Sequence, residues 1–579
     1  MPSTLYRLFF FLFTASGALS CATECKCTSK DSCWPSTLEW AHLSSQLSRP
    51  IFHVQPLGYH CHNPHFDDKV CAEVQANSLD PIWRPDQPGA AQYDNLEFTT
   101  TSQCLVPGNR IALCGQGRVP TLGVNATTVS DLEKALKFAY ERNLKVHIKN
   151  TGHDFLGRGL GPGSLMIWVH HFRFTEFSAE FRYAGGQHGG FPAVSVGPGT
   201  QWADAFAFAA ANEVVLAGGI GALGSVGAAG GWPMGAGHNI ISPAIGLGAD
   251  NIVEIDLVLP NGTLVTANQY ENTDLFWAVR GGGGPSFGTS ARLVYKAHPR
   301  MPLYAAFFEA NAATSSAFVS LLDTWHAHLP SIAEAGWSGY YIFVDASYLA
   351  LMYLLPHGNP VVGNATLGPF IADAKAISGV DITTDASQTY PDFNSWLMAN
   401  IQDPVNVVGY NFSQHTNLVG LGIATASILL PKEVFTNETK AHRMSEALAA
   451  MAGGIGQHVA GGVVAEKDID FNAVHPSWRS ALVDLVTYDA FPDDTSEAEI
   501  AARRRKLSSL VDPLRALTPG VAQYLNEPDF LIPDYPSANW GSHYERLLRI
   551  KQSIDPTNQL LVKQGVGAVG WDEEQICRL

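Results

Sequence analysis

Residues 149–158 read Lys-Asn-Thr-Gly-His-Asp-Phe-Leu-Gly-Arg, and this stretch decides how the rest of the chain is interpreted. It follows residues 145–148, whose composition predicts a short strand. Gly152 lets the backbone turn and approach another group closely, because it lacks a β-carbon. The turn therefore presents His153 at the end of a strand, where its ring can meet the edge of a bound cofactor.

Two glycine-rich segments lie further along the chain, at 217–251 and 277–288. Within the first, Gly219, Gly221 and Gly224 match the G-x-G-x-x-G pattern of a dinucleotide-binding turn. That pattern normally opens a helix, but here no helical pattern follows and glycines continue beyond it. Such a loop exposes backbone N–H groups that suit a pyrophosphate. The alternative is a glycine-rich loop with only a structural role.

Together these three segments resemble the vanillyl-alcohol-oxidase and berberine-bridge-enzyme family of flavoproteins, and within it the secreted fungal oxidases of the isoamyl-alcohol-oxidase type. Residues 472–479 resemble the substrate domain of the berberine-bridge subgroup, and 524–530 and 554–558 resemble its C-terminal signature. The resemblance implies an α+β fold. It has a two-part FAD-binding domain of the PCMH type and an α+β substrate domain whose antiparallel sheet covers the flavin.

The order of these segments predicts the domain organisation. We expect a signal peptide at 1–20, a cysteine-rich region at 21–115, the FAD-binding domain at 116–300, the substrate domain at 301–520, and a berberine-bridge-like segment at 521–579 that returns to the FAD domain.

Local patterns predict several elements inside the FAD-binding domain. Helical spacing favours a helix over 129–142 that is capped by Ser130. Pro260-Asn261-Gly262 predicts a hairpin between two β-branched runs. A short helix is expected over 272–279, just before four consecutive glycines.

In this family the histidine of the first turn is bonded covalently to the 8α-methyl of FAD, so the resemblance implies the same bond at His153. A histidine that only caps the turn is the alternative. Many relatives also bond the flavin C6 through a cysteine, but this chain has none between Cys114 and Cys577, so we expect a single bond. The resemblance implies further FAD contacts at Asn150, Thr151, Gly152, Asp154, Gly157, Arg158, Gly197, Gly199, Gly218, Gly219, Gly224, Ser225, Gly227, Gly230, Gly235, Gly237, His238, Gly248, Asn251, Ile252, Val253 and Asn526.

Tyr524 and Asn526 are the candidate catalytic or substrate-orienting residues, because the family places this Y-x-N element close to the flavin. A tyrosine can take a proton from a hydroxyl only where positive charge or hydrogen bonding lowers its pKa, which is normally about 10. Tyr524 as a half-buried packing residue is the alternative. Glu527 and Asp529 can be read as simple surface charges.

The sequence favours neither a metal site nor a hydrolase. His60, His62 and His65 cluster around Cys61, but their spacing matches no standard zinc motif. No nucleophile elbow or zinc-protease motif occurs. We therefore predict no metal.

Both ends of the chain point to the secretory pathway. Residues 1–20 have the charged start, apolar run and small-residue end of a signal peptide. Eight of the nine cysteines lie before residue 115 and Cys577 lies near the end, which suggests a disulfide-tied N-terminal region to which the C-terminus is pinned. Short loops favour the pairs Cys61–Cys71 and Cys104–Cys114. Because the number of cysteines is odd, at least one thiol is free or pairs elsewhere. Glycosylation sequons occur at Asn125, Asn261, Asn364, Asn411 and Asn437.

With 36 basic and 53 acidic residues, the chain has a net negative charge and is a poor partner for nucleic acid or an anionic membrane. We expect a monomer whose partners are a small-molecule substrate and O2. These features predict a secreted FAD-dependent oxidase. It would move hydride from an alcohol-type C–H to covalent FAD and then pass the electrons to O2, giving hydrogen peroxide. The alternatives are an FAD-linked oxidative cyclase or dehydrogenase of fungal secondary metabolism, and a non-enzymatic extracellular binding protein.

Overall fold

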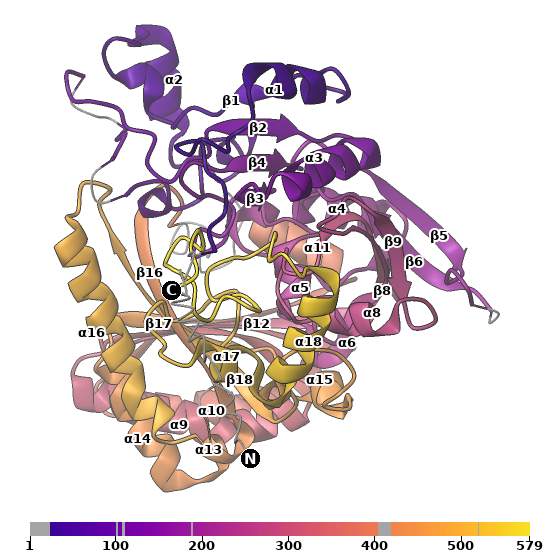
Figure 1. Cartoon of the computed structure of the whole chain (residues 1–579). Coiled ribbons are helices and arrows are strands. Elements are labelled where there is room, and N and C mark those ends of the chain that lie inside the picture. Colours follow the sequence, from indigo (N-terminus) through magenta and orange to yellow (C-terminus); the bar gives the residue numbers. More distant parts are fainter. Residues whose placement is uncertain are drawn as a thin grey trace, which may run out of the picture.

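The computed structural model describes residues 24–99, 102–106, 110–186, 189–402, 418–518, 520 and 522–579. The expected signal peptide, Cys21 and the sequon at Asn411 lie outside these residues. The described chain combines helices with largely antiparallel sheets, which confirms the α+β class (Figure 1). Among its helices, none has both the length and the apolar character that crossing a bilayer requires.

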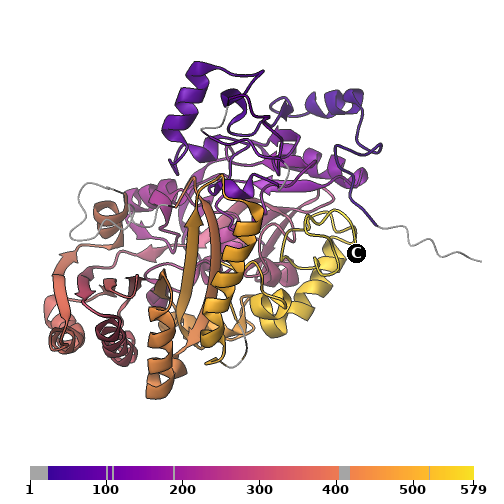
Figure 2. The same ribbon diagram turned by 90° about the vertical axis from the view of Figure 1, so that its left-hand side faces the viewer.

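The N-terminal sheet has the strand order β1-β2-β4-β3, in which β4 runs parallel to both β2 and β3. Its strands are β1 (Phe52–His53), β2 (Leu122–Asn125), β3 (Val146–Lys149) and β4 (Leu165–Trp168). Helices α1 (Thr37–Ser44) and α2 (Asp68–Asn77) belong to the same end of the molecule (Figure 2).

Helix α3 (Val129–Glu141) packs Leu132 and Leu136 into the core of the N-terminal sheet. The predicted cap was wrong. Thr128 has an extended conformation and its side chain accepts a hydrogen bond from the backbone of Asp131, so Ser130 already lies inside the helix.

The second sheet has the order β5-β6-β10-β8-β9 and is antiparallel throughout. Its strands are β5 (Thr175–Phe181), β6 (Phe191–Val196), β8 (Ile252–Val258), β9 (Leu264–Asn268) and β10 (Thr289–Lys296). The pairing of β8 with β9 confirms the predicted hairpin, and α8 (Thr273–Val279) confirms the short helix.

The glycine-rich segment between these sheets forms only single turns of helix, so no long helix follows the G-x-G-x-x-G match. They are α5 (Gly231–Met234), α6 (Ser242–Ile245) and α7 (Gly248–Asn251). Before them, α4 (Trp202–Ala211) leads into β7 (Val214–Val215), which pairs with β11 (His298–Pro299).

A seven-stranded antiparallel sheet, here called the large sheet, has the order β15-β12-β14-β13-β17-β18-β16. Its strands are β12 (Leu303–Ala312), β13 (Ser338–Val344), β14 (Tyr348–Pro356), β15 (Val380–Tyr390), β16 (Gly422–Pro431), β17 (Gly453–His458) and β18 (Ala481–Phe491). One face packs on helices α9 (Ser315–Glu334), α10 (Pro360–Lys375), α13 (Lys432–Thr436), α14 (Glu438–Ala449) and α16 (Glu497–Arg515).

The opposite face of the large sheet packs on the rest of the molecule. Because side chains alternate along a strand, Tyr341 and Phe343 join the helical core while Tyr340 and Ile342 join the core of the second sheet. The shorter helices α11 (Phe393–Leu397), α15 (Gly462–Glu466), α17 (Tyr535–Trp540) and α18 (Tyr544–Ile554) complete the described fold.

The described chain contains four disulfides, of which one joins its two ends. The predicted pairs Cys61–Cys71 and Cys104–Cys114 are confirmed. Cys577 bonds to Cys25, which agrees with the expectation that the C-terminus is linked to the N-terminal region. Cys27 bonds to Cys33.

Candidate active site

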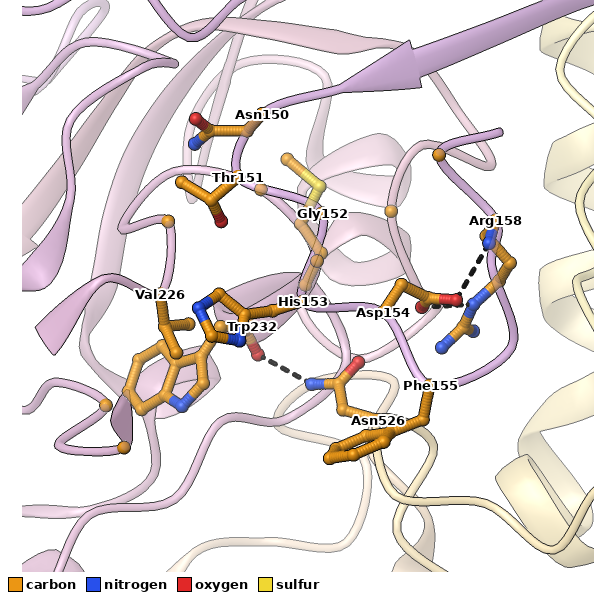
Figure 3. A pocket seen from close by; sticks show the side chains of 18 of the residues that line it. Asn150, Thr151, Gly152, His153, Asp154, Phe155, Arg158, Val226, Trp232 and Asn526 are labelled. Carbon is orange, nitrogen blue, oxygen red and sulfur yellow. Dashed lines mark hydrogen bonds and ion pairs between the residues drawn. The ribbon is translucent and has the colours of Figure 1, made fainter. Parts of the chain in front are cut away.

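A cavity of about 350 Å³ lies between the face of the large sheet and the turns of the two smaller sheets. Its wall brings together many of the sequence-predicted cofactor residues, namely Asn150, Thr151, Gly152, His153, Asp154, Gly157, Arg158, Gly219, Gly227, Gly230, His238 and Asn526 (Figure 3). Tyr524 also lines it. Segments far apart in the sequence therefore meet at one site.

The turn after β3 carries His153 into this cavity. Gly152 has a φ of +84°, and a β-carbon there would lie 3.1 Å from Ala91 Cα, so both the backbone conformation and the close approach require glycine. His153 Nε2 lies 2.7 Å from Ser225 Oγ, whereas Nδ1 has no hydrogen bond to the described part of the chain. Loss of hydration lowers the pKa of His153 to about 3, so the ring is neutral at physiological pH.

Asp154 and Arg158 fix the rest of the turn and join it to the C-terminal segment (Figure 3). The Arg158 guanidinium donates to Asp154 Oδ2 at 2.6 Å through Nε, and to the backbone oxygen of Leu525 at 3.1 Å through Nη2. This bridge positions the neighbouring residues Tyr524 and Asn526 against the cavity.

Glycines of the 217–237 loop leave room along the wall. Gly221, Gly230 and Gly231 line the cavity, and a β-carbon at any of them would meet no atom within 4 Å. Thr289 also lines the cavity, and its buried Oγ1 has no hydrogen-bond partner among the described residues. Open backbone and an unused hydroxyl suit a polar ligand such as a pyrophosphate-bearing cofactor.

The other predicted cofactor residues do not line the cavity. They are Gly197, Gly199, Gly218, Gly224, Ser225, Gly235, Gly237, Gly248, Asn251, Ile252 and Val253. Several of them allow close packing behind the wall: a β-carbon on Gly218 would clash with Trp202, and one on Gly248 with Trp232. Ser225 acts from behind the wall through its contact with His153.

The environment of Tyr524 is the reverse of what a tyrosine base requires. Its side chain is fully buried, and desolvation followed by the nearby Glu527 raises its pKa well above 10. Tyr524 Oη receives hydrogen bonds from Asn526 Nδ2 at 2.8 Å and from the backbone of Gly237. These two donors do not offset burial, so Tyr524 keeps its proton and has it available to donate.

Glu527 and Asp529 are not the surface charges that the sequence suggested. Asp529 is 2% exposed and its Oδ2 accepts from Arg515 at 2.6 Å. Glu527 lines the cavity with a side chain that is 18% exposed. One carboxyl oxygen, Oε2, accepts from Gln457 Nε2 at 3.0 Å, and Oε1 lies 3.5 Å from His238 Nε2.

Sequence analysis missed a row of polar residues on the cavity face of the large sheet. Tyr340 on β13 pairs with Gln457 on β17, which pairs with Asp484 on β18. The row therefore lies on one face, and Tyr340 and Gln457 line the cavity. Alternation alone places each residue on a face, but only the register of three strands brings them together.

The cysteine-rich region offers no support for a zinc site at His60, His62 and His65. Both ring nitrogens of His62 are 3.1 Å from backbone oxygens, those of Leu105 and Ala112. Within the described residues, the group with metal-compatible geometry is His238, Asp484 and Glu527, whose ligand atoms lie within 4.8 Å of one another.

The sequence matches two family models. Residues 120–268 match the FAD binding domain, and residues 523–567 match the berberine and berberine-like family. An FAD-linked oxidoreductase of Arthroderma benhamiae is 33% identical over the full length of both chains. A VAO-type flavoprotein oxidase of Thermothelomyces thermophilus, VAO615, is 28% identical, also over both full lengths.

Solved structures share the fold. The VAO-type flavoprotein MtVAO713 from Myceliophthora thermophila superimposes with a TM-score of 0.86 at 27% identity, covering 96% of this chain and 100% of its own. Glucooligosaccharide oxidase from Acremonium strictum, which carries a 6-S-cysteinyl, 8α-N1-histidyl FAD, has a TM-score of 0.66 at 16% identity, covering 84% of this chain and 94% of its own.

Proposed function

The chain belongs to the vanillyl-alcohol-oxidase and berberine-bridge-enzyme family of FAD-linked oxidoreductases, and from this membership we propose that it is a secreted oxidase with covalent FAD. Its substrate is an alcohol-type small molecule, and its final electron acceptor is O2. The observation that carries the proposal is the position of His153 on the cavity wall, where Ser225 engages Nε2 and leaves Nδ1 available.

The residues around the cavity fit the cofactor. Neutral His153 offers the Nδ1 lone pair for a bond to the 8α-methyl, the same ring position that carries the flavin in the Acremonium strictum oxidase. Gly221, Gly230 and Gly231 leave open space along the wall, and Thr289 Oγ1 supplies a hydroxyl without a hydrogen-bond partner among the described residues. When bound, FAD supplies the hydride acceptor and the route by which two electrons reach O2.

Tyr524 and Asn526 orient the substrate in this proposal. Because Tyr524 keeps its proton, its hydroxyl donates to the substrate oxygen, and Asn526 Nδ2 fixes the direction of that hydroxyl. The C–H bond that breaks is then held at a constant place on the cavity wall, and the apolar side chains of Val226, Trp232 and Ile455 help to exclude water.

Secretion rests on the disulfides and on the sequons. Four disulfides are typical of a chain folded in an oxidising compartment. Asn261, Asn364 and Asn437 are exposed and can carry glycans, while Asn125 is half-buried in β2 and is the least accessible of the described sequons.

The test is oxygen uptake and peroxide release by purified holoenzyme over a panel of alcohols, sugars and phenols. Peroxide formed in equal amount to the oxygen consumed, with at least one alcohol, supports the oxidase. Reduction of the flavin without peroxide release would contradict the oxidase and favour the dehydrogenase or oxidative cyclase.

A further inference from the structure

Two carboxyl groups lie close together at the cavity, where Glu527 is part of the wall and Asp484 is not. Asp484 on β18 is fully buried, and neither of its carboxyl oxygens has a hydrogen-bond partner in the described chain. The carboxyl groups of Asp484 and Glu527 and the ring of His238 lie within 4.8 Å of one another. A buried carboxyl without partners is costly, so its retention at this place calls for a role.

The surroundings of Asp484 disfavour a charge on its carboxyl group. Burial, and then the proximity of Glu527, raise the pKa of Asp484 well above its usual range. Asp484 is therefore neutral at physiological pH, since two desolvated anions at this separation repel strongly. Glu527 faces the cavity and accepts a hydrogen bond from Gln457.

We propose that Glu527 is the catalytic base that takes the hydroxyl proton of the substrate, and that Asp484 and His238 are positioning residues that hold its carboxylate at the cavity. This inference rests on the proposed oxidase function. The O–H bond of the alcohol breaks and its proton moves to Glu527 Oε1, while the neighbouring C–H bond loses a hydride to the FAD that the family employs. The alcohol becomes a carbonyl compound, and one proton and one hydride are accounted for.

Several other titratable groups face Glu527. They are His238, Asp484, Tyr93, Tyr340 and Tyr524. Burial raises the pKa of all three tyrosines, so each keeps its proton. His238 is occupied on both sides, by Tyr340 Oη 3.5 Å from Nδ1 and by Glu527 Oε1 3.5 Å from Nε2.

The carboxyl group of Glu527 also bears on the class of substrate. A carboxyl group at this end of the cavity suits a hydroxyl donor better than a carboxylate or phosphate, and the cavity wall includes the apolar residues Ile455 and Leu418. We therefore expect an uncharged alcohol whose hydroxyl approaches Glu527 and Tyr524.

Glu527→Gln tests the base because it keeps the shape of the side chain and the partner amide of Gln457. We expect FAD to be incorporated normally and flavin reduction by the best alcohol of the panel to slow by about 10²–10⁴-fold, with loss of the decline at acidic pH. Asp489→Asn, a change at a partly exposed carboxylate on β18, the strand that carries Asp484, is the control and should leave both unchanged. A Glu527→Gln rate within a few-fold of wild type overturns the assignment.

If Glu527→Gln does not incorporate FAD, Glu527→Asp retains an acid and is expected to keep the acidic decline at a lower rate. A pH-independent rate in that variant contradicts the proposal. Failure of wild-type enzyme to be reduced by any alcohol would instead refute the proposed function itself.

Infrared spectroscopy of the substrate-free holoenzyme tests Asp484 without reference to activity. Wild type should show the carbonyl band of a protonated carboxylic acid at neutral pH, and Asp484→Asn should lack it. An identical band in both proteins, or a stoichiometric divalent cation in wild type that Asp484→Asn loses, overturns the positioning role.

Discussion

His153 Nε2 lies 2.7 Å from Ser225 Oγ, and this contact joins the turn after β3 to the glycine-rich loop on the other side of the cavity. A neutral imidazole that donates through Nε2 has its lone pair on Nδ1. The Ser225 hydroxyl can accept from Nε2, which suits the tautomer in which Nδ1 is the nucleophile, although Ser225 does not line the cavity itself.

Ser225→Ala should slow covalent attachment of the flavin without preventing FAD from binding. Loss of one hydrogen bond of about 1 kcal/mol lowers the population of the reactive tautomer by about fivefold. To measure the rate of attachment, apoprotein is mixed with FAD and samples are precipitated with acid at intervals. The flavin that stays with the polypeptide is then followed over time. Ser164→Ala removes another fully buried serine hydroxyl, bonded to Gly161 O, and should attach flavin at the wild-type rate. Equal attachment rates in wild type, Ser225→Ala and Ser164→Ala would show that Ser225 does not influence covalent attachment.

Two glycine substitutions should separate folding from cofactor binding. Gly152→Ala forces a side chain into a left-handed backbone conformation at +84°, which costs about 1–2 kcal/mol and lowers both the Tm and FAD incorporation. Gly221→Ala adds a methyl group that meets no protein atom within 4 Å, so it should leave the Tm of apoprotein unchanged and weaken FAD binding. A lowered apoprotein Tm for Gly221→Ala would show that this glycine serves the fold.

His326 should make the protein less stable in mild acid. It is fully buried on α9, its Nδ1 bonds to Ser445 Oγ, and burial lowers its pKa to about 3 from 6.5. Below pH 6.5 the unfolded chain takes up a proton that the folded protein refuses, so the free energy of unfolding falls by up to about 1.4 kcal/mol per pH unit until pH approaches 3.

Urea unfolding between pH 7 and pH 4 measures this slope. His326→Asn keeps a donor near Ser445 and should flatten the slope relative to wild type. His328→Asn, a change at a partly exposed histidine on the same helix, should keep it. If the free energy of unfolding depends on pH equally in wild type and His326→Asn, the acid sensitivity belongs to other groups.

Tyr524→Phe should leave the flavin bound and slow its reduction by about tenfold, the loss expected for one substrate-orienting hydrogen bond. Because Tyr524 keeps its proton over the working range, the pH dependence of reduction should keep its wild-type shape. Stopped-flow reduction at several pH values measures both quantities. A shifted or abolished pH dependence would return the role of base to Tyr524.

Local patterns in the sequence predicted the parts of the fold that depend on neighbours along the chain. The hairpin of β8 and β9 follows from Pro260-Asn261-Gly262, because a tight turn fixes the pairing of the strands that flank it. The helix cap was misplaced by two residues because both Thr128 and Ser130 are good caps, and only the backbone conformation distinguishes them.

The substrate-facing wall could not be predicted in the same way. His153 and Tyr524 stand in stretches that resemble a known family, whereas Asp484 lies in a strand without a motif. Strand register brings its neighbour Gln457 beside it, whereas Glu527 comes from a turn in the C-terminal segment. The raised pKa of Tyr524 likewise depends on burial, which a motif does not report.

The most direct test of the account is the fate of the flavin when the purified protein is precipitated with acid and digested. We expect the yellow colour to remain with the polypeptide, and mass spectrometry to find the flavin on a single peptide that contains His153. His153→Ala should release the flavin into the supernatant. Flavin that washes off the wild-type protein, or that is attached to a second peptide as well, would contradict a single bond through His153.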